Sequence, residues 1–182
     1  MAYYYLMAQL PYLVYEQKSP MSSADFMDLA SPMLTKNDAA LLKQLSLTPK
    51  DKTTGCDFID GWRDWDKSLR LNLARLRAIK LNRELPSEQP PVINVNIIAV
   101  ASKAVDEPAV EGEMILDKAR WRAIEDLAGG NDYFHRNNVF AYYLKLLLIE
   151  RRQSFDVEKG FVEYKSLYAS IMESAQNSGD LK

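Results

Sequence analysis

The sequence is poor in the residues that build disulfide frameworks and metal sites. Its 182 residues include one cysteine, Cys56, and one histidine, His135. A single cysteine excludes an internal disulfide and fits a reducing compartment, while metal sites usually need several ligands. Glycine is also scarce, at seven residues, and alternating strand patterns are few. The shortages exclude a disulfide-stapled scaffold and argue against a mainly β protein.

The chain also lacks an excess of charge of either sign. Lys and Arg number 23 and Asp and Glu 25, for a net charge of −2. Such a chain has no global field to hold nucleic acid, so binding to a phosphate backbone would need a strong local patch. We therefore expect no nucleic-acid partner. The 47% of hydrophobic residues is ordinary for a globular protein.

Long hydrophobic runs are missing as well. The most apolar stretch, Val139–Ile149, would form a helix about 16 Å long, against a bilayer core of roughly 30 Å. The first residues, MAYYYLMAQLP, lack the basic start and long apolar stretch of a secretion signal. We expect no direct membrane insertion. A helix apolar on all sides for three turns is instead a central core helix, which emerges into solvent at Glu150–Arg152.

Helical spacing recurs along the chain and predicts an all-α fold. The predicted helices follow Ser22–Ser23, Asn37, Cys56, Asn96, Pro108, Asn137 or Asn138, and Asp156. Residues 92–101 are ambiguous, because their β-branched side chains would also suit a strand; the Asn96 cap favours a helix. We expect a single helical domain over residues 1–182, with residues 1–50 as a candidate N-terminal subregion and 176–182 as a frayed tail. The bundle would hold about six to seven helices around a central apolar helix.

The longest helix carries apolar residues on two faces. One row contains Trp62, Trp65, Leu69, Leu73 and Leu76, and the row on the opposite side contains Leu71, Ala74, Ala78, Leu81 and Leu85. Two apolar faces predict that the second half of this helix packs between two partners. Pro86 is expected to close it.

Acidic residues crowd the start of the same helix, at Asp57, Asp60, Asp64 and Asp66. Asp60 and Asp64 lie one turn apart and, with Glu111 or Glu113, would suit a hard cation. The same crowding is expected because anionic side chains favour the positive end of a helix dipole, and nearby Arg63, Lys67 and Arg70 would neutralise the charge. We favour the structural interpretation.

The remaining reactive residues also favour structural roles. Cys56 stands near a helix N-terminus, where a thiol pKa can fall, but it has no second cysteine and a small semi-buried residue is the simpler interpretation. His135 lies at a helix entry, where it would cap or contact solvent. The basic residues Arg70, Arg75, Arg77, Lys80 and Arg83 do not share one face. We assign no catalytic, cofactor-binding or metal-ligating residue, expect no cofactor, and predict that the chain is not an enzyme.

Aromatic residues are the feature that most suggests contact with other proteins. Tyr3, Tyr4 and Tyr5 are consecutive. Three consecutive side chains cannot all point inward, so at least one is available for a partner surface.

Four stretches resemble an uncharacterised bacterial family encoded beside V-type (V/A-type) ATPase genes: YYYLMAQLP, LRLNLARLRAIKLNRE, EGEMILDKARWRAIEDL and FHRNNVFAYYLKLLLIERRQSFDVEKG. Gln153 stands where the last of these motifs has tryptophan. The helical pattern is also similar to part of the ATPase C (d) subunit, which is an all-helical funnel. The stretch FAYYLKLLLIERR resembles an inner helix of that subunit.

The resemblance implies a non-catalytic subunit, connector or assembly factor of a V-type ATPase, a complex that transports protons or sodium ions. Its partners would be stalk or ring subunits, and its location would be the cytoplasm, peripheral to the membrane through the complex. The alternative is a free-standing cytosolic helical adaptor with another protein partner.

Overall fold

The computed structural model describes residues 3–48, 53–129, 133–155 and 157–179, with the side chains of 157–159 and 173–179 left aside. All eight elements in these ranges are α-helices, so the predicted all-α class is confirmed. They are α1 (Tyr4–Gln9), α2 (Ser23–Ala30), α3 (Lys36–Leu42), α4 (Asp57–Lys80), α5 (Val95–Asp106), α6 (Ala109–Ala128), α7 (Arg136–Gln153) and α8 (Val157–Gly179). None of these helices is both long enough and apolar enough to cross a membrane.

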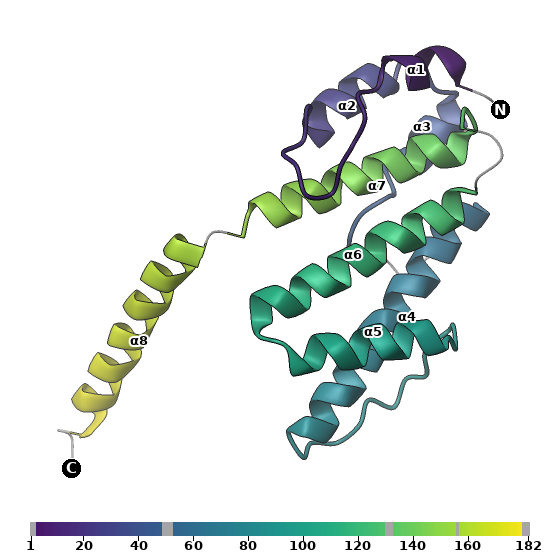
Figure 1. Ribbon diagram of the computed structural model, residues 1–182. Coiled ribbons are helices and arrows are strands. Elements are labelled where there is room, and N and C mark those ends of the chain that lie inside the picture. Colours follow the sequence, from purple (N-terminus) through teal and green to yellow (C-terminus); the bar gives the residue numbers. More distant parts are fainter. Residues whose placement is uncertain (1–2, 49–52, 130–132, 156, 180–182) are drawn as a thin grey trace. The chain divides into compact units, whose positions relative to one another are not determined.

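Chain contacts divide the molecule into two compact units, Met1–Glu150 and Arg151–Lys182. The first unit contains α1 to α6 and most of α7, and the second contains α8. In the first unit α7 runs between the short N-terminal helices and α6 (Figure 1).

The predicted central helix is confirmed. In α7 the residues Val139, Phe140, Leu144, Leu146, Leu148 and Ile149 are all fully buried. They pack against side chains from α1 to α4 and α6 in one continuous core. The run is apolar all round because neighbouring helices cover it on several sides, and a polar residue there would be desolvated without a partner.

A second, smaller core joins α4, α5 and α6. Leu69 and Leu73 of α4 meet Ile97 and Ala101 of α5 and Leu116 of α6. Residues 95–106 are therefore helical, and the strand alternative for this stretch is wrong. Asn94 caps α5 by accepting a hydrogen bond from the Asn96 N–H at 2.8 Å, so the cap lies two residues before the one predicted.

The other helix ends agree with the sequence in part. Ser22 caps α2, at the position predicted, and it does so in a reciprocal capping box with Asp25 that was not predicted. Thr35, not Asn37, caps α3, and its hydroxyl accepts from the Asp38 N–H. Asp156, the predicted cap of the last helix, lies outside the described residues. The helix α8 extends through Gly179.

The long helix α4 ends earlier and packs on fewer sides than predicted. It stops at Lys80, six residues before Pro86, and Asn82 adopts a positive φ of 50°. The first apolar row is largely buried, but Leu81 and Leu85 of the second row are 61% and 58% exposed. The expectation that both rows are covered is therefore wrong for the described part of the chain.

Candidate docking surface

The aspartates at the start of α4 do not converge. Asp57 and Asp64 are exposed. Asp60 accepts hydrogen bonds from the Thr54 N–H and hydroxyl and from the Gly55 N–H, all within 3.2 Å. Burial alone would raise the pKa of Asp60, but these hydrogen bonds hold it below its ordinary value. Asp60 thus closes the loop that leads into α4.

The fourth aspartate belongs to a buried ion-pair network between α4 and α6. Asp66 is fully buried and accepts from Arg120 Nε at 2.8 Å and from Arg70 Nε at 2.5 Å. Arg120 also donates to buried Asp117 at 2.7 Å. Burial alone would lower the pKa of the Arg120 guanidinium, but the two carboxylates raise it. The network cross-links α4 and α6, and the charges of Asp66, Asp117 and Arg120 are inaccessible to a substrate.

The remaining residues considered for chemistry are also separate from one another. Cys56 is buried in the main core at the start of α4. His135 uses its Nδ1 to accept from the Asn137 N–H at 3.3 Å, at the entry to α7. Glu111 is exposed on α6. Within the described ranges no three His, Cys, Asp or Glu side chains lie close enough to hold a metal ion.

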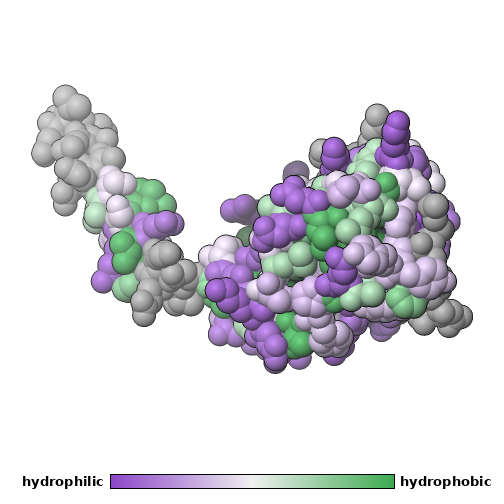
Figure 2. Space-filling model, turned by 90° about the horizontal axis from the view of Figure 1, so that it is seen from above, coloured by the Kyte–Doolittle hydropathy of each residue, from purple (hydrophilic) through white to green (hydrophobic). Residues whose placement is uncertain are grey.

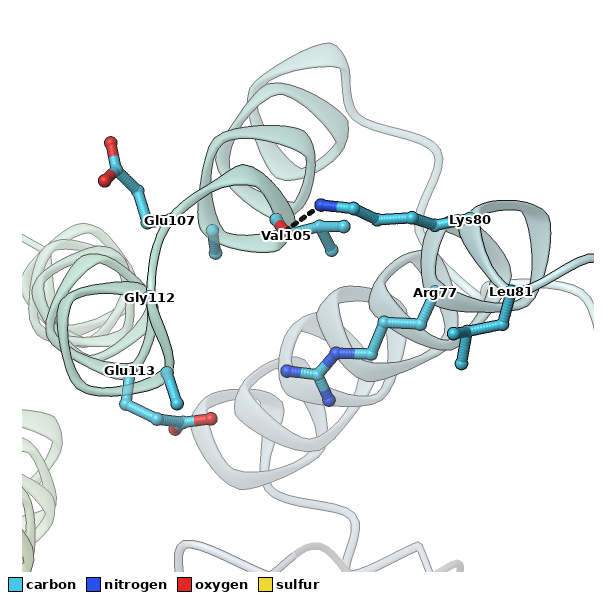
Figure 3. A pocket seen from close by; sticks show the side chains of 9 residues that line it. Arg77, Lys80, Leu81, Val105, Glu107, Gly112 and Glu113 are labelled. Carbon is cyan, nitrogen blue, oxygen red and sulfur yellow. Dashed lines mark hydrogen bonds between the residues drawn. The ribbon is translucent and has the colours of Figure 1, made fainter.

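The basic residues of α4 hold the adjoining loop and α5. Arg75 donates to the Glu88 carbonyl at 2.7 Å, and Lys80 donates to the Val105 carbonyl at 3.0 Å. A hollow of about 280 Å³ lies beside Lys80. The side chains of Arg77 and Glu113 extend into it from opposite sides (Figure 3). Since both signs of charge line this hollow, it has no preference for anions.

The consecutive tyrosines diverge as the sequence requires. Tyr3 is buried, and its hydroxyl donates to Asp38 and accepts from the Thr35 N–H. Burial and the Asp38 carboxylate raise the pKa of Tyr3. Tyr4 and Tyr5 point outward, 61% and 74% exposed. The anchored Tyr3 therefore fixes the direction of its two exposed neighbours.

Two further tyrosines extend this exposed region. The Tyr4 ring lies 4.5 Å from the Phe134 ring, which in turn lies 5.5 Å from the Tyr133 ring. Tyr133 and Tyr12, 57% and 87% exposed, line one hollow of about 250 Å³. We call Tyr4, Tyr5, Tyr12 and Tyr133, with this hollow, the tyrosine surface.

The hollow of the tyrosine surface is lined by polar and apolar groups in about equal part. Met7, Leu13 and Ala141 contribute apolar atoms. The Tyr142 hydroxyl donates to the Pro11 carbonyl at 2.9 Å, which ties the segment after α1 to α7. Charged Glu125 and Lys145 also border the hollow, but they pair with each other at 2.8 Å. The lining is therefore preformed and its nearest charges are neutralised.

Burial also sets the ionisation of two adjacent tyrosines of α7. Desolvation, followed by the nearby Tyr133, raises the pKa of Tyr142 to about 12. Burial, followed by Glu150, raises the pKa of Tyr143. Both phenols are neutral at physiological pH, so the Tyr142 hydroxyl keeps the proton that it donates to Pro11.

The size and lining of the hollow suit side chains of another protein. Pockets for small-molecule ligands usually measure about 300–1,000 Å³, which exceeds the 250 Å³ here. Tyrosine is enriched at protein interfaces because it offers a large apolar area at a low cost in conformational entropy. On the face of the first unit shown in Figure 2, strongly hydrophobic patches are small and separated.

Sequence reasoning found this surface only in part. The tyrosine triplet predicted an exposed side chain near the N-terminus, and two are exposed. Tyr12 and Tyr133 were not singled out, because their approach depends on the packing of α7 against the segment after α1. The Tyr12 position had one signal, its place directly after Pro11 at the end of an apolar stretch.

Comparison with known proteins gives one match. Residues 93–174, a little under half of the chain, match a family model described as "Protein of unknown function (DUF2764)". This segment spans α5, α6, α7 and most of α8. No curated protein and no solved structure matches the chain.

Proposed function

We propose that this chain is a non-catalytic helical protein that binds a partner protein through its tyrosine surface. The observation that carries the proposal is the pair of exposed tyrosines, Tyr12 and Tyr133, that line a preformed hollow. Exposed Tyr4 is linked to Tyr133 through the Phe134 ring, and exposed Tyr5 is its neighbour in α1. The titratable groups of α4 support it, because Asp60 and Asp66 already serve the fold itself.

The exposed aromatic area is large enough to matter for binding. A buried aromatic side chain contributes about 150–250 Å², so four tyrosines at these exposed fractions offer on the order of 500 Å². A typical specific interface buries about 800 Å² on each partner. The tyrosine surface can therefore form the centre of an interface, with polar neighbours at its rim.

We further propose that the partner is a stalk or ring subunit of a V-type ATPase. The support for this is the resemblance of four sequence stretches to a family encoded beside ATPase genes. The chain would then act in the cytoplasm as a subunit, connector or assembly factor, held near the membrane by the complex. The alternative is a free-standing adaptor, which would use the same surface for another protein.

Affinity capture from native membranes tests both parts of the proposal. The full chain carries a tag, and captured proteins are identified by mass spectrometry. We expect ATPase stalk or ring subunits with the wild-type protein and their loss with Tyr5→Ser/Tyr12→Ser. These two side chains are 74% and 87% exposed, so the substitutions leave the core intact.

The matched control is Ile93→Ser/Val95→Ser, which removes two equally exposed apolar side chains elsewhere in the first unit. This variant should capture the same subunits as wild type. Capture of other proteins through the tyrosine surface, without ATPase subunits, would favour the adaptor. Equal capture by the tyrosine variant and the control would reject the surface itself.

A further inference from the structure

The second unit presents an apolar stripe along a single helix. In α8 the side chains of Phe161, Tyr164, Leu167, Tyr168, Ile171 and Met172 are 44–62% exposed. At about 100° per residue these six positions fall within an arc of about 140°. In Figure 2 the described part of α8 shows hydrophobic and hydrophilic residues side by side. We call these six residues the α8 stripe.

The spacing within the α8 stripe is that of a coiled-coil seam. Phe161, Tyr164, Tyr168 and Ile171 follow one another at intervals of three, four and three residues, the a and d positions of a heptad. The rings of Tyr164 and Tyr168 stack at 6.2 Å along this seam. A seam of this kind packs knobs into the holes of another helix with the same repeat.

A helix with such a face depends on a partner for its stability. Isolated helices gain little from propensity alone, and most helical stability in proteins comes from packing an amphipathic face. In the described part of the second unit, α8 is the one complete helix. The α8 stripe therefore needs a surface from elsewhere.

Charge argues against a lipid surface as that partner. Interfacial helices carry Lys and Arg on the polar face, which attract anionic lipids. The α8 sequence contains three acidic residues, Glu158, Glu163 and Glu173, against Lys159 and Lys165. A helix with more acidic than basic residues gains no attraction from anionic headgroups, so a protein surface is favoured.

The same charges permit two copies to meet. With both signs present and a small net charge, two α8 helices repel each other little. In coiled coils the positions beside the seam select a partner through charge. Here two of those positions are the apolar Leu167 and Met172, so nothing on the stripe requires a partner of opposite charge. The stripe is complementary to itself.

The available area also suits a pair. At about half exposure, each of the six side chains offers on the order of 100 Å², or about 600 Å² for each helix. Two copies would bury about 1,200 Å², which reaches the lower limit of stable interfaces. We propose that this chain self-associates, with the α8 stripe of one copy packed against the α8 stripe of a second.

The mass of the full-length protein in solution, measured by light scattering across a wide concentration range, tests the proposal. Wild type should have twice the chain mass. Tyr164→Ser/Ile171→Ser removes two seam side chains and should shift the monomer–dimer midpoint to a concentration at least about tenfold higher. The control, Val162→Ser/Ala169→Ser, changes two exposed residues outside the stripe and should remain dimeric.

Hydrogen exchange separates self-association from packing within one copy. We expect α8 amides in wild type to gain protection as protein concentration rises. A wild-type monomer at every concentration would overturn the proposal, as would a seam variant that dimerises like the control. Protection of α8 in a monomer would also overturn it, since the stripe would then be covered within the chain.

The outcome is independent of the proposed function. Tyr5→Ser/Tyr12→Ser should lose ATPase subunits in capture but remain dimeric. The α8 seam variant should become monomeric, with its tyrosine surface intact. The two proposals are therefore tested separately, and failure of one does not contradict the other.

Discussion

At the scale of single residues, three buried charges of this protein serve its fold. Asp66, Asp117 and Arg120 are almost completely buried, and they join α4 to α6. A buried ion pair adds little net stability compared with apolar side chains of similar volume. Removal of one partner, however, leaves the other charge buried without compensation, which is strongly destabilising. Buried arginine should therefore matter far more than an exposed lysine of the same helix.

We expect Arg120→Met to destabilise the protein by about 3–5 kcal/mol, because Asp66 and Asp117 would lose the guanidinium that they share. Lys118→Met is the matched control. Lys118 pairs with Glu16 at 2.8 Å with both side chains about half or more exposed, and such pairs contribute about 0–1 kcal/mol. Urea unfolding measures both values. Equal losses in the two variants would mean that the network does not stabilise α4 against α6.

Tyr142 gives a prediction for alkaline pH. Its pKa rises from an ordinary 10.0 to about 12 in the folded protein. The unfolded chain therefore ionises this phenol first, and its stabilising contribution, complete below pH 10, is lost as pH rises toward 12. In this window wild type should lose up to about 1.4 kcal/mol for each pH unit through this residue.

Tyr142→Phe removes both the ionisation and the hydrogen bond to Pro11. The variant should be less stable near neutral pH, by about 0.5–1.5 kcal/mol, and its stability should fall less steeply between pH 10 and 12. Urea unfolding at several pH values measures the two slopes, and absorbance of tyrosinate follows the ionisation. Parallel slopes would show that Tyr142 ionises at an ordinary pKa.

At the scale of elements, close packing between α5 and α6 depends on one glycine. A Cβ at Gly112 would lie 2.7 Å from the Ala104 carbonyl oxygen, a backbone atom that cannot move aside alone. Gly112→Ala should therefore destabilise the first unit by about 1–3 kcal/mol, although alanine favours helices.

Gly160 in α8 is the natural control, because a Cβ there meets nothing within 4 Å. Gly160→Ala should leave the first unit unchanged and favour helix in α8, by up to about 1 kcal/mol. Thermal unfolding followed by near-ultraviolet circular dichroism, which reports the buried Trp62, separates the two variants. Unchanged unfolding of the Gly112 variant would mean that α5 moves away from α6 at no cost.

The elements also show what sequence patterns can and cannot predict. The helix α7 was predictable, because an apolar run that ends in Glu150–Arg152 is buried in almost any helical context. The helix α1 was missed, since six residues with little periodicity give no signal. The second row of α4 was wrongly expected to be covered. Periodicity reports where apolar residues lie along a helix, and the presence of a partner in the same chain is a separate question.

The candidate site likewise has one part that the sequence predicts and one part that it does not. Exposure of at least one N-terminal tyrosine could be inferred from the sequence, because three consecutive side chains cannot all point inward. The hollow between Tyr12 and Tyr133 could not, because it forms only when segments far apart in the chain meet. The aspartates suggested a metal site by number, but their directions on α4 separate them.

At the scale of the whole molecule, the protein consists of a helical first unit with a tyrosine surface and a second unit with the α8 stripe. One surface is proposed for a V-type ATPase subunit and the other for a second copy.

The most direct test of the central claim is the affinity of the purified protein for the isolated V-type ATPase. A titration of labelled protein should show saturable binding, weakened at least about tenfold by Tyr5→Ser/Tyr12→Ser and unchanged by Ile93→Ser/Val95→Ser. Absence of saturable binding by the wild-type protein, or equal affinities for wild type and the tyrosine variant, would contradict the account.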